Sequence, residues 1–199
     1  MELRRLLSVR GRALVASAAV VFFVIAVSQR WGIDGTDGGA TVDAIGQGTP
    51  VSVDRPAPAF SQPLLSGHGS LSLRRYDGEV VVVNFWASSC TACRLEVPQL
   101  DGLWRAYGGR GVRFVGVDYQ DGRAAAVNFS RSLGMGYPSV FDPSGRVGND
   151  YGIFGLPTTY IIAPDDRIRY VVYGRINPAS FRVALESLLK PTPSETAGR

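Results

Sequence analysis

Cysteine, histidine and methionine are scarce in this sequence of 199 residues, which contains two cysteines, one histidine and two methionines. Two cysteines cannot form the network of disulfides that stabilises small secreted domains. A single histidine excludes a zinc centre built from a cluster of histidines and cysteines within one chain. Charged residues make up only 19% against 45% hydrophobic residues, a balance that excludes a disordered chain. The net charge of +4 comes mostly from scattered basic residues and does not indicate a nucleic-acid partner.

One long apolar run lies near the N-terminus. Residues 13–27 contain a single polar residue, Ser17, and follow four arginines. A helix of fifteen residues spans roughly 22 Å, short of the ~30 Å hydrocarbon core of a bilayer, but the flanking Arg12 and Arg30 can snorkel outward. We therefore predict a cytoplasmic basic segment over residues 1–12 and a single-pass signal anchor in the cell membrane over residues 13–30, with the rest of the chain extracytoplasmic. A cleaved signal peptide is the alternative, although no clear A-x-A site follows the run.

Glycine-rich and polar segments flank the remaining sequence. Residues 31–55 are rich in Gly, Asp and Thr without hydrophobic periodicity, which predicts a flexible linker. Residues 191–199 form a polar tail by the same criterion. The segment between them, residues 56–190, is long enough for one folded domain.

Strand and helix signals alternate along residues 56–190. The most apolar segment, VVVVNFWA at 80–87, predicts a strand buried on both faces in the middle of a sheet. Residues 95–107 follow with the helical spacing of apolar side chains, and Asn177 with Pro178 marks the start of a last helix. The other expected elements are a hairpin within 59–76, strands at 112–119, 137–142, 157–164 and 168–174, and helices at 122–133 and 147–154. Their order predicts an α/β fold with a mixed central sheet flanked by helices.

The two cysteines form a C-x-x-C motif, Cys90 to Cys93, between the central strand and the next helix. Because the N-terminus of a helix stabilises a thiolate, we expect a lowered pKa for the Cys90 thiol. A Cys90 thiolate would attack a substrate disulfide, and Cys93 would then release the product by attacking Cys90. Zinc ribbons, copper chaperones and structural disulfides use the same spacing, but no second C-x-x-C supplies further zinc ligands. The motif therefore favours dithiol–disulfide exchange.

The segment VVVVNFWASSCTACRLEVPQL at 80–100 resembles the active-site region of thioredoxin-like proteins. It is most similar to the membrane-anchored group around TlpA, ResA and CcmG (DsbE). The similarity covers residues 56–190 and includes Gly116–Asp118, the turn at 141–145 and Gly155–Pro157. It implies a thioredoxin-like fold and a redox-active Cys90–Cys93 disulfide, with no other cofactor and no metal. It also implies a cis Pro157 that faces the cysteines and positions the substrate.

Two positions depart from the pattern of this family. Ser89 stands where the family usually has Trp before the first cysteine, and Asn84 stands where thioredoxin has a buried Asp that handles the proton of the second thiol. Glu96 follows Cys93 by three residues on nearly the same helix face, so we expect it to accept the Cys93 proton, provided that burial raises its pKa. A solvated Glu96 on the helix surface is the alternative.

Further residues near the motif are expected to contact the substrate. Three of them surround the cysteine pair: Trp86, Ser89 and Leu156. Ligands of open α/β sheets gather at the carboxyl ends of strands, so three residues near the end of the next strand are candidates for the lining of a groove: Asp118, Tyr119 and Asp121. His68, in the predicted hairpin, is expected to be a surface residue.

These features predict an extracytoplasmic thiol–disulfide oxidoreductase that reduces protein disulfides. The resemblance implies the haem-binding cysteine pair of apocytochrome c as substrate and a membrane thiol carrier as electron donor. A thioredoxin-fold peroxidase is one alternative, but its P-x-x-x-T-x-x-C pattern requires Pro and Thr where this chain has Val83 and Ala87. A Cu(I)-binding module that uses both thiolates is another, although the chain is poor in Met and His.

Overall fold

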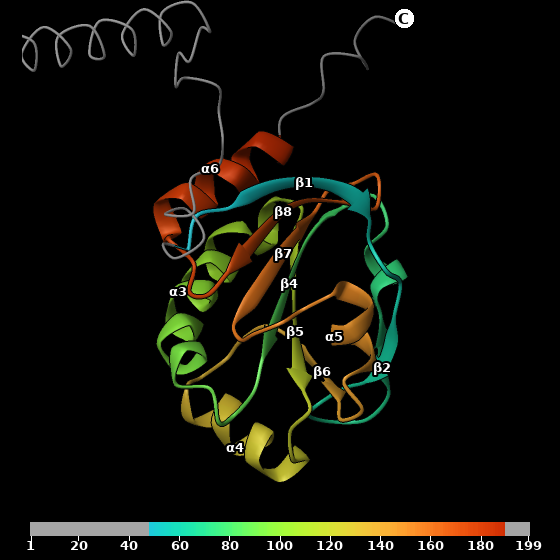
Figure 1. Cartoon of the computed structure of the whole chain (residues 1–199), viewed down its shortest axis with the longest axis vertical. Coiled ribbons are helices and arrows are strands. Elements are labelled where there is room, and N and C mark those ends of the chain that lie inside the picture. Colours follow the sequence, from blue (N-terminus) through green and yellow to red (C-terminus); the bar gives the residue numbers. More distant parts are fainter. Residues whose placement is uncertain (1–47, 190–199) are drawn as a thin grey trace, which may run out of the picture. The chain divides into compact units, whose positions relative to one another are not determined.

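Six strands form one mixed sheet at the centre of the domain (Figure 1). The computed structural model describes residues 48–189. The strands are β1 (Val51–Pro56), β2 (Ser61–Pro63), β3 (Ser70–Ser72), β4 (Val80–Trp86), β5 (Val112–Tyr119), β6 (Ser139–Asp142), β7 (Thr158–Ile162) and β8 (Arg167–Tyr173). The helices are α3 (Thr91–Tyr107), α4 (Arg123–Ser132), α5 (Arg146–Tyr151) and α6 (Pro178–Leu189), with short 3₁₀ helices at Leu73–Tyr76 and Gly108–Arg110.

The strand order in the main sheet is β1-β8-β7-β4-β5-β6. Strand β4 lies in the middle, parallel to β5 and antiparallel to β7, and all seven of its residues are buried. The continuous apolar run therefore forms the central strand, as predicted, because both faces of the sheet are covered. The predicted hairpins at 59–76 and at 157–174 are also confirmed, as β2–β3 and β7–β8.

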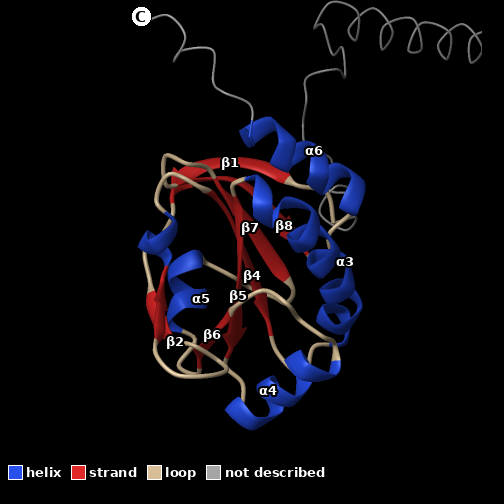
Figure 2. Ribbon diagram, turned by 180° about the vertical axis from the view of Figure 1, so that it is seen from behind, coloured by secondary structure: helices blue, strands red, loops and turns tan. Residues whose placement is uncertain are grey.

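Two layers cover the sheet (Figure 2). Helices α3 and α6 pack on one face, where Leu100 and Phe181 are among the buried residues. The β2–β3 hairpin and α5 pack on the other face, where Tyr151 lies among the aromatic rings of Phe85 and Tyr160. Helix α4 lies beyond the carboxyl end of β5. This arrangement is the predicted α/β fold with a mixed sheet between helices.

Strand β1 occupies residues that the sequence predicted to be linker. It covers Val51–Pro56, so the end of the predicted 31–55 linker belongs to the sheet, and the ordered domain begins earlier than the predicted residue 56. The strand pairs antiparallel with β8, Val51 opposite Val171, and its register shifts between Ser52 and Arg55. Alternate β1 side chains pack on the core, which gives this glycine-poor segment its place in the sheet.

The predicted basic segment at 1–12, the membrane anchor at 13–30 and the polar tail at 191–199 lie outside the described residues. Within residues 48–189, every helix is too short or too polar to cross a membrane.

Candidate active site at the cysteine pair

A tight turn between β4 and α3 presents the two cysteines. The Cys90 backbone N–H donates to the Ala87 carbonyl at 3.1 Å, which closes the turn over Ser88 and Ser89. Cys90 is the N-cap of α3, and its Sγ accepts a hydrogen bond from the Cys93 backbone N–H at 3.1 Å. The sequence-based placement of Cys90 at the helix N-terminus is confirmed. An N–H group of the first turn therefore points at the sulfur that is expected to carry a negative charge.

The cysteines form a disulfide, Cys90 to Cys93, with their Cα atoms 5.3 Å apart. Cys90 is half-buried, whereas Cys93 is 1% exposed. Only the first sulfur is therefore open to another molecule, and the second is covered by the protein. This asymmetry fits the order of attack predicted from the sequence, in which Cys90 meets the substrate and Cys93 acts afterwards.

Trp86 lies behind the cysteines and not at the surface. It is fully buried and stacks on Phe129 of α4, with ring centroids 5.1 Å apart and planes at 16°. Both rings pack in the same cluster as Cys93. The prediction that Trp86 contacts substrate is wrong, because a side chain at the end of the central strand points into the space that α3 and α4 cover. Trp86 instead belongs to the buried cluster on which the cysteine pair packs.

Glu96 is buried on the sheet-facing side of α3, at 1% exposure. Its Oε1 accepts from the Ile176 backbone N–H at 2.8 Å and its Oε2 from Asn84 Nδ2 at 3.0 Å. Asn84 Nδ2 also donates to Thr159 Oγ1 at 2.9 Å, which fixes the amide between α3 and β7. Burial raises the pKa of Glu96 to about 7, although these hydrogen bonds and the charge of Arg175 lower it. The alternative of a solvated Glu96 is wrong.

Pro157 follows a cis peptide bond, as the resemblance implied. It is buried, and its carbonyl accepts from the Gly174 backbone N–H at 2.9 Å, which ties the loop before β7 to the end of β8. Leu156 is partly buried and packs on the cluster that contains both cysteines. Ser89 is exposed in the turn before Cys90. Ser89 is therefore open to solvent next to Cys90 in the chain, and Leu156 is partly open to solvent at the cluster that contains Cys93.

Of the three candidate groove residues after β5, Tyr119 lies apart from Asp118 and Asp121. Tyr119 lies over α5, where its ring approaches Gly148, and Asp118 is fully buried on the opposite face. Asp121 reaches back to the cysteine turn, and its Oδ2 accepts from the Ser88 backbone N–H at 2.6 Å. Tyr119 therefore shares no groove with Asp118, because neighbours in a strand alternate between the two faces of the sheet. His68 is exposed in the β2–β3 turn, as expected.

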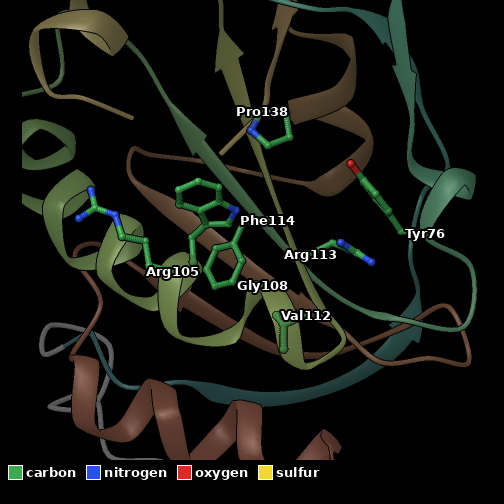
Figure 3. A pocket seen from close by; sticks show the side chains of 9 residues that line it. Tyr76, Arg105, Gly108, Val112, Arg113, Phe114 and Pro138 are labelled. Atoms are coloured by element: carbon green, nitrogen blue, oxygen red, sulfur yellow. The ribbon is translucent and has the colours of Figure 1, made fainter. Parts of the chain in front are cut away.

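A pocket of about 450 Å³ lies far from the cysteines (Figure 3). Its lining includes Val112 and Phe114, at the amino end of β5, and Gly108 at the end of α3. Since β4 runs parallel to β5 and the cysteines follow the carboxyl end of β4, this pocket opens at the opposite end of the sheet. Its two arginines are paired with Asp101 and Glu79. The pocket is therefore no part of the cysteine site.

Comparison with known proteins agrees with this geometry. The sequence model described as the AhpC/TSA family matches residues 53–171, which include both cysteines, Glu96 and Pro157. The chain belongs to the AhpC/TSA family. The names of its curated relatives describe thiol–disulfide exchange.

Thiol:disulfide interchange protein DsbE of Tatumella citrea is 31% identical over 176 residues, which cover 85% of this chain and 89% of the relative. Thiol-disulfide oxidoreductase ResA of Geobacillus kaustophilus is 30% identical over 140 residues, covering 70% of this chain and 80% of ResA. The crystal structure of a putative DsbE from Chlorobium tepidum has a TM-score of 0.64 and 26% identity, and covers 69% of this chain and 97% of its own. The thioredoxin-like fold and the resemblance stated above are confirmed, and this AhpC/TSA family member is a thiol–disulfide oxidoreductase.

Sequence reasoning missed several partners of the site residues. The Ile176 backbone N–H that binds Glu96 lies 80 residues further along the chain, and a backbone group leaves no signal in the side-chain pattern. The link from Asp121 to the cysteine turn crosses 33 residues. A usable signal existed for this second link, because β4 and β5 were both predicted as strands of one sheet, and the segments that follow neighbouring parallel strands lie side by side.

Proposed function

We propose that this thiol–disulfide oxidoreductase is a reductant of protein disulfides that acts outside the cytoplasm while anchored in the membrane. The observation that carries the proposal is the asymmetry of the site: a half-buried Cys90 at a helix N-terminus and a buried carboxyl group on the same helix as the covered Cys93. The first exchange step requires a nucleophile that faces outward. The second step requires an acceptor for the proton of the second thiol.

In the first step, the Cys90 thiolate of the reduced enzyme attacks one sulfur of a substrate disulfide. A bond forms between Cys90 Sγ and that sulfur, and the other substrate sulfur leaves as a thiolate that takes up a proton. The Cys93 backbone N–H, which points at Cys90 Sγ at 3.1 Å, supports this step because it stabilises the attacking thiolate.

In the second step, Cys93 releases the product. Its thiol loses a proton, the resulting thiolate attacks Cys90 Sγ, and the enzyme disulfide forms as the second substrate thiolate leaves. Glu96 is the proposed catalytic acceptor of the Cys93 proton, because a carboxyl group with a pKa of about 7 can take up and return a proton near neutral pH. The substrate gains two electrons and the dithiol of the enzyme is oxidised to the disulfide seen here.

The substrate is proposed to lie across the surface beside Cys90 that is formed by the turn before Cys90 and the loop before β7. Ser89 and Leu156 supply contacts from the turn and from the loop before β7, and Pro157 holds that loop in place through its bond to Gly174. Phe154, in the same loop, is 77% exposed and contacts the Tyr173 ring, with centroids 4.7 Å apart and planes tilted by 34°. An exposed apolar surface of this kind suits a segment of an unfolded or extended protein.

The resemblance to the ResA and CcmG (DsbE) group supports a proposal for the substrate and for the electron donor. The substrate would be the oxidised haem-binding cysteine pair of apocytochrome c, and a membrane thiol carrier would reduce the Cys90–Cys93 disulfide again. The arginines before residue 13 and the apolar run at 13–27 support the membrane location, with the domain on the outer side.

The reduction potential of the Cys90–Cys93 couple tests the direction of electron flow. The full-length protein in a mild detergent is equilibrated with thiol buffers, and the fraction of reduced enzyme is measured by alkylation. A potential near or below about −220 mV supports a reductant, whereas a value near the −120 mV of strong oxidants contradicts it.

A cysteine variant tests the substrate. Cys93→Ser keeps the attacking sulfur and loses the resolving one, so we expect it to accumulate mixed disulfides with its partner in cells. Cys90→Ser is the matched control and should trap nothing. Recovery of apocytochrome c from the first variant alone supports the proposed substrate, and recovery of other proteins only would contradict it.

A further inference from the structure

Asp118 is a buried carboxyl group that the exchange steps above do not use. It lies at the end of β5, in register with Trp86 of β4, and is fully buried. Neither of its oxygens accepts a hydrogen bond from residues 48–189. An ionised carboxylate in such a place would be desolvated without compensation, and this is costly enough that buried acids in apolar surroundings hold their proton.

Asp121 lies next to Asp118 and has the opposite surroundings. Its Oδ2 accepts from the Ser88 backbone N–H at 2.6 Å, and its Oδ1 accepts from the Gly122 backbone N–H at 2.7 Å. Two carboxylates cannot bond to each other, but a protonated Asp118 becomes a donor to Asp121. Burial and the charge of Asp121 raise the pKa of Asp118 to about 8, while for Asp121 burial is outweighed by hydrogen bonds, led by those from Ser88, which lower its pKa.

The other charges that act on Asp118 come from two elements. Arg123 at the start of α4 favours ionisation, but its guanidinium donates to the carbonyls of Leu64 and Leu65 and lies over the ring of Phe141. Asp142 at the end of β6 opposes ionisation. The guanidinium of Arg123 is thus bound to other partners, and the carboxylate of Asp121 is the group placed to accept a proton from Asp118.

The Ser88 backbone N–H connects the Asp118–Asp121 pair to the turn that carries Cys90. Ser88 is the second residue of the turn that Ala87 and Cys90 close, and its N–H points out of the turn toward Asp121. The turn sets the position of Cys90 at the N-terminus of α3. Asp121 therefore binds the turn from outside.

We propose that Asp118 and Asp121 share one proton and together hold the Ala87–Cys90 turn, which makes them positioning residues for the exchange reaction at Cys90. Loss of the shared proton leaves two neighbouring carboxylates, whose repulsion draws Asp121 away from the Ser88 N–H. The turn then loosens, and the added negative charge opposes a thiolate at Cys90. The inference rests on the chemistry of the cysteine pair and not on the substrate or direction of electron flow proposed above.

The oxidised full-length protein in detergent micelles provides the direct test, because its cysteines do not titrate. The ¹⁵N–¹H resonance of Ser88 and the side-chain ¹³C carboxyl resonances of Asp118 and Asp121 are followed between pH 6 and 10. We expect all three to move together, and protection of the Ser88 amide from hydrogen exchange to fall about tenfold across the transition. Independent movement of the two carboxyl resonances, or a Ser88 resonance with no transition, would overturn the proposal.

Two variants distinguish an effect of the Asp118–Asp121 pair from the effect of any nearby negative charge. Asp118→Asn keeps a donor to Asp121 but has no proton to lose, so the Ser88 transition should disappear. Asp142→Asn removes a neighbouring buried charge and serves as the matched control, in which the transition should persist at lower pH. A transition that survives unchanged in Asp118→Asn refutes the pair. The carboxyl resonances of the unmodified protein decide the matter without any variant, should Asp118→Asn not fold.

Reactivity tests the positioning role itself. In the reduced protein, the rate of Cys90 alkylation by iodoacetamide is divided by the thiolate fraction measured at each pH. This ratio should fall severalfold above the transition in the unmodified protein and stay flat in Asp118→Asn. A ratio that is flat in both proteins would show that the pair supports the turn without affecting Cys90, which contradicts the proposal.

Discussion

Replacing Glu96 by Gln should change how the stability of the oxidised protein depends on pH. Gln has nearly the same shape as Glu, and its carbonyl oxygen can still accept from the Ile176 N–H, but it carries no proton to lose. In the native protein the pKa of Glu96 is raised by burial from the usual 4.5 to about 7. The folded state therefore binds this proton more tightly than the unfolded chain does. Glu96 favours folding at acid pH, and this advantage is lost as the pH rises from about 4.5 through about 7.

The size of the effect follows from the two pKa values. A difference of 2.5 units corresponds to about 3.4 kcal/mol once both states are fully ionised. Between pH 5 and pH 8.5 the two titration curves predict that the ionisation of Glu96 lowers the free energy of unfolding by about 2.5 kcal/mol. Glu96→Gln removes this contribution. The variant should therefore gain about 2.5 kcal/mol relative to the unmodified protein over the same interval, whatever its stability at pH 5.

Urea unfolding of the oxidised proteins at pH 5, 7 and 8.5, followed by circular dichroism, measures the difference directly. All other titrating groups are common to both proteins and cancel in the comparison, apart from those that touch Glu96. A gap between the two proteins that stays constant from pH 5 to pH 8.5 would refute the reasoning. It would mean that the carboxyl group keeps one protonation state throughout, and Glu96 could not then relay the Cys93 proton near neutral pH.

Three further substitutions test the packing and capping around the site by the same urea assay. Gly116→Ala should lower the free energy of unfolding by about 1–3 kcal/mol, because an added Cβ would meet Ser139 Oγ at 2.3 Å and the buried Trp86 Nε1 at 2.8 Å; an unchanged midpoint would contradict this. Leu100→Ala should cost about 2–5 kcal/mol, since the side chain is fully buried between α3 and the sheet, and a loss below 1 kcal/mol would contradict that packing. Asn177→Ala should cost about 1 kcal/mol, because Asn177 Oδ1 accepts from the backbone N–H groups of the first turn of α6; Asn177→Asp is the control that should keep most of the cap.

The elements that the sequence predicted correctly are those defined by local pattern. The apolar run of β4, the turn residues between β7 and β8, and the Asn177–Pro178 start of α6 each leave a signal within a few residues. Strand β1 was assigned to the linker because its short alternation follows a glycine-rich stretch, and only the partner strand β8 identifies it.

In the candidate site, too, the local features could be predicted from the sequence and the long-range contacts could not. Cys93 and Glu96 lie on α3 and Cys90 caps it, so the spacing of three residues predicted the common face of Cys93 and Glu96. The burial of Trp86 depends on α4, and the environment of Asp118 depends on Asp121 and on the turn before Cys90. These arrangements bring together segments that lie far apart in the chain, which no local pattern records.

The pairing of β1 with β8 also bears on how the chain is made. Val51 pairs with Val171, which the ribosome adds 171 − 51 = 120 residues later. At typical rates of synthesis, β1 therefore waits on the order of ten seconds for its partner. During that interval β4, β5 and β6 have already emerged and can associate, while the hydrogen-bonding groups of β1 stay open. Strand β1 can therefore pair in the sheet only after β8, the last strand of the sheet along the chain, has been made.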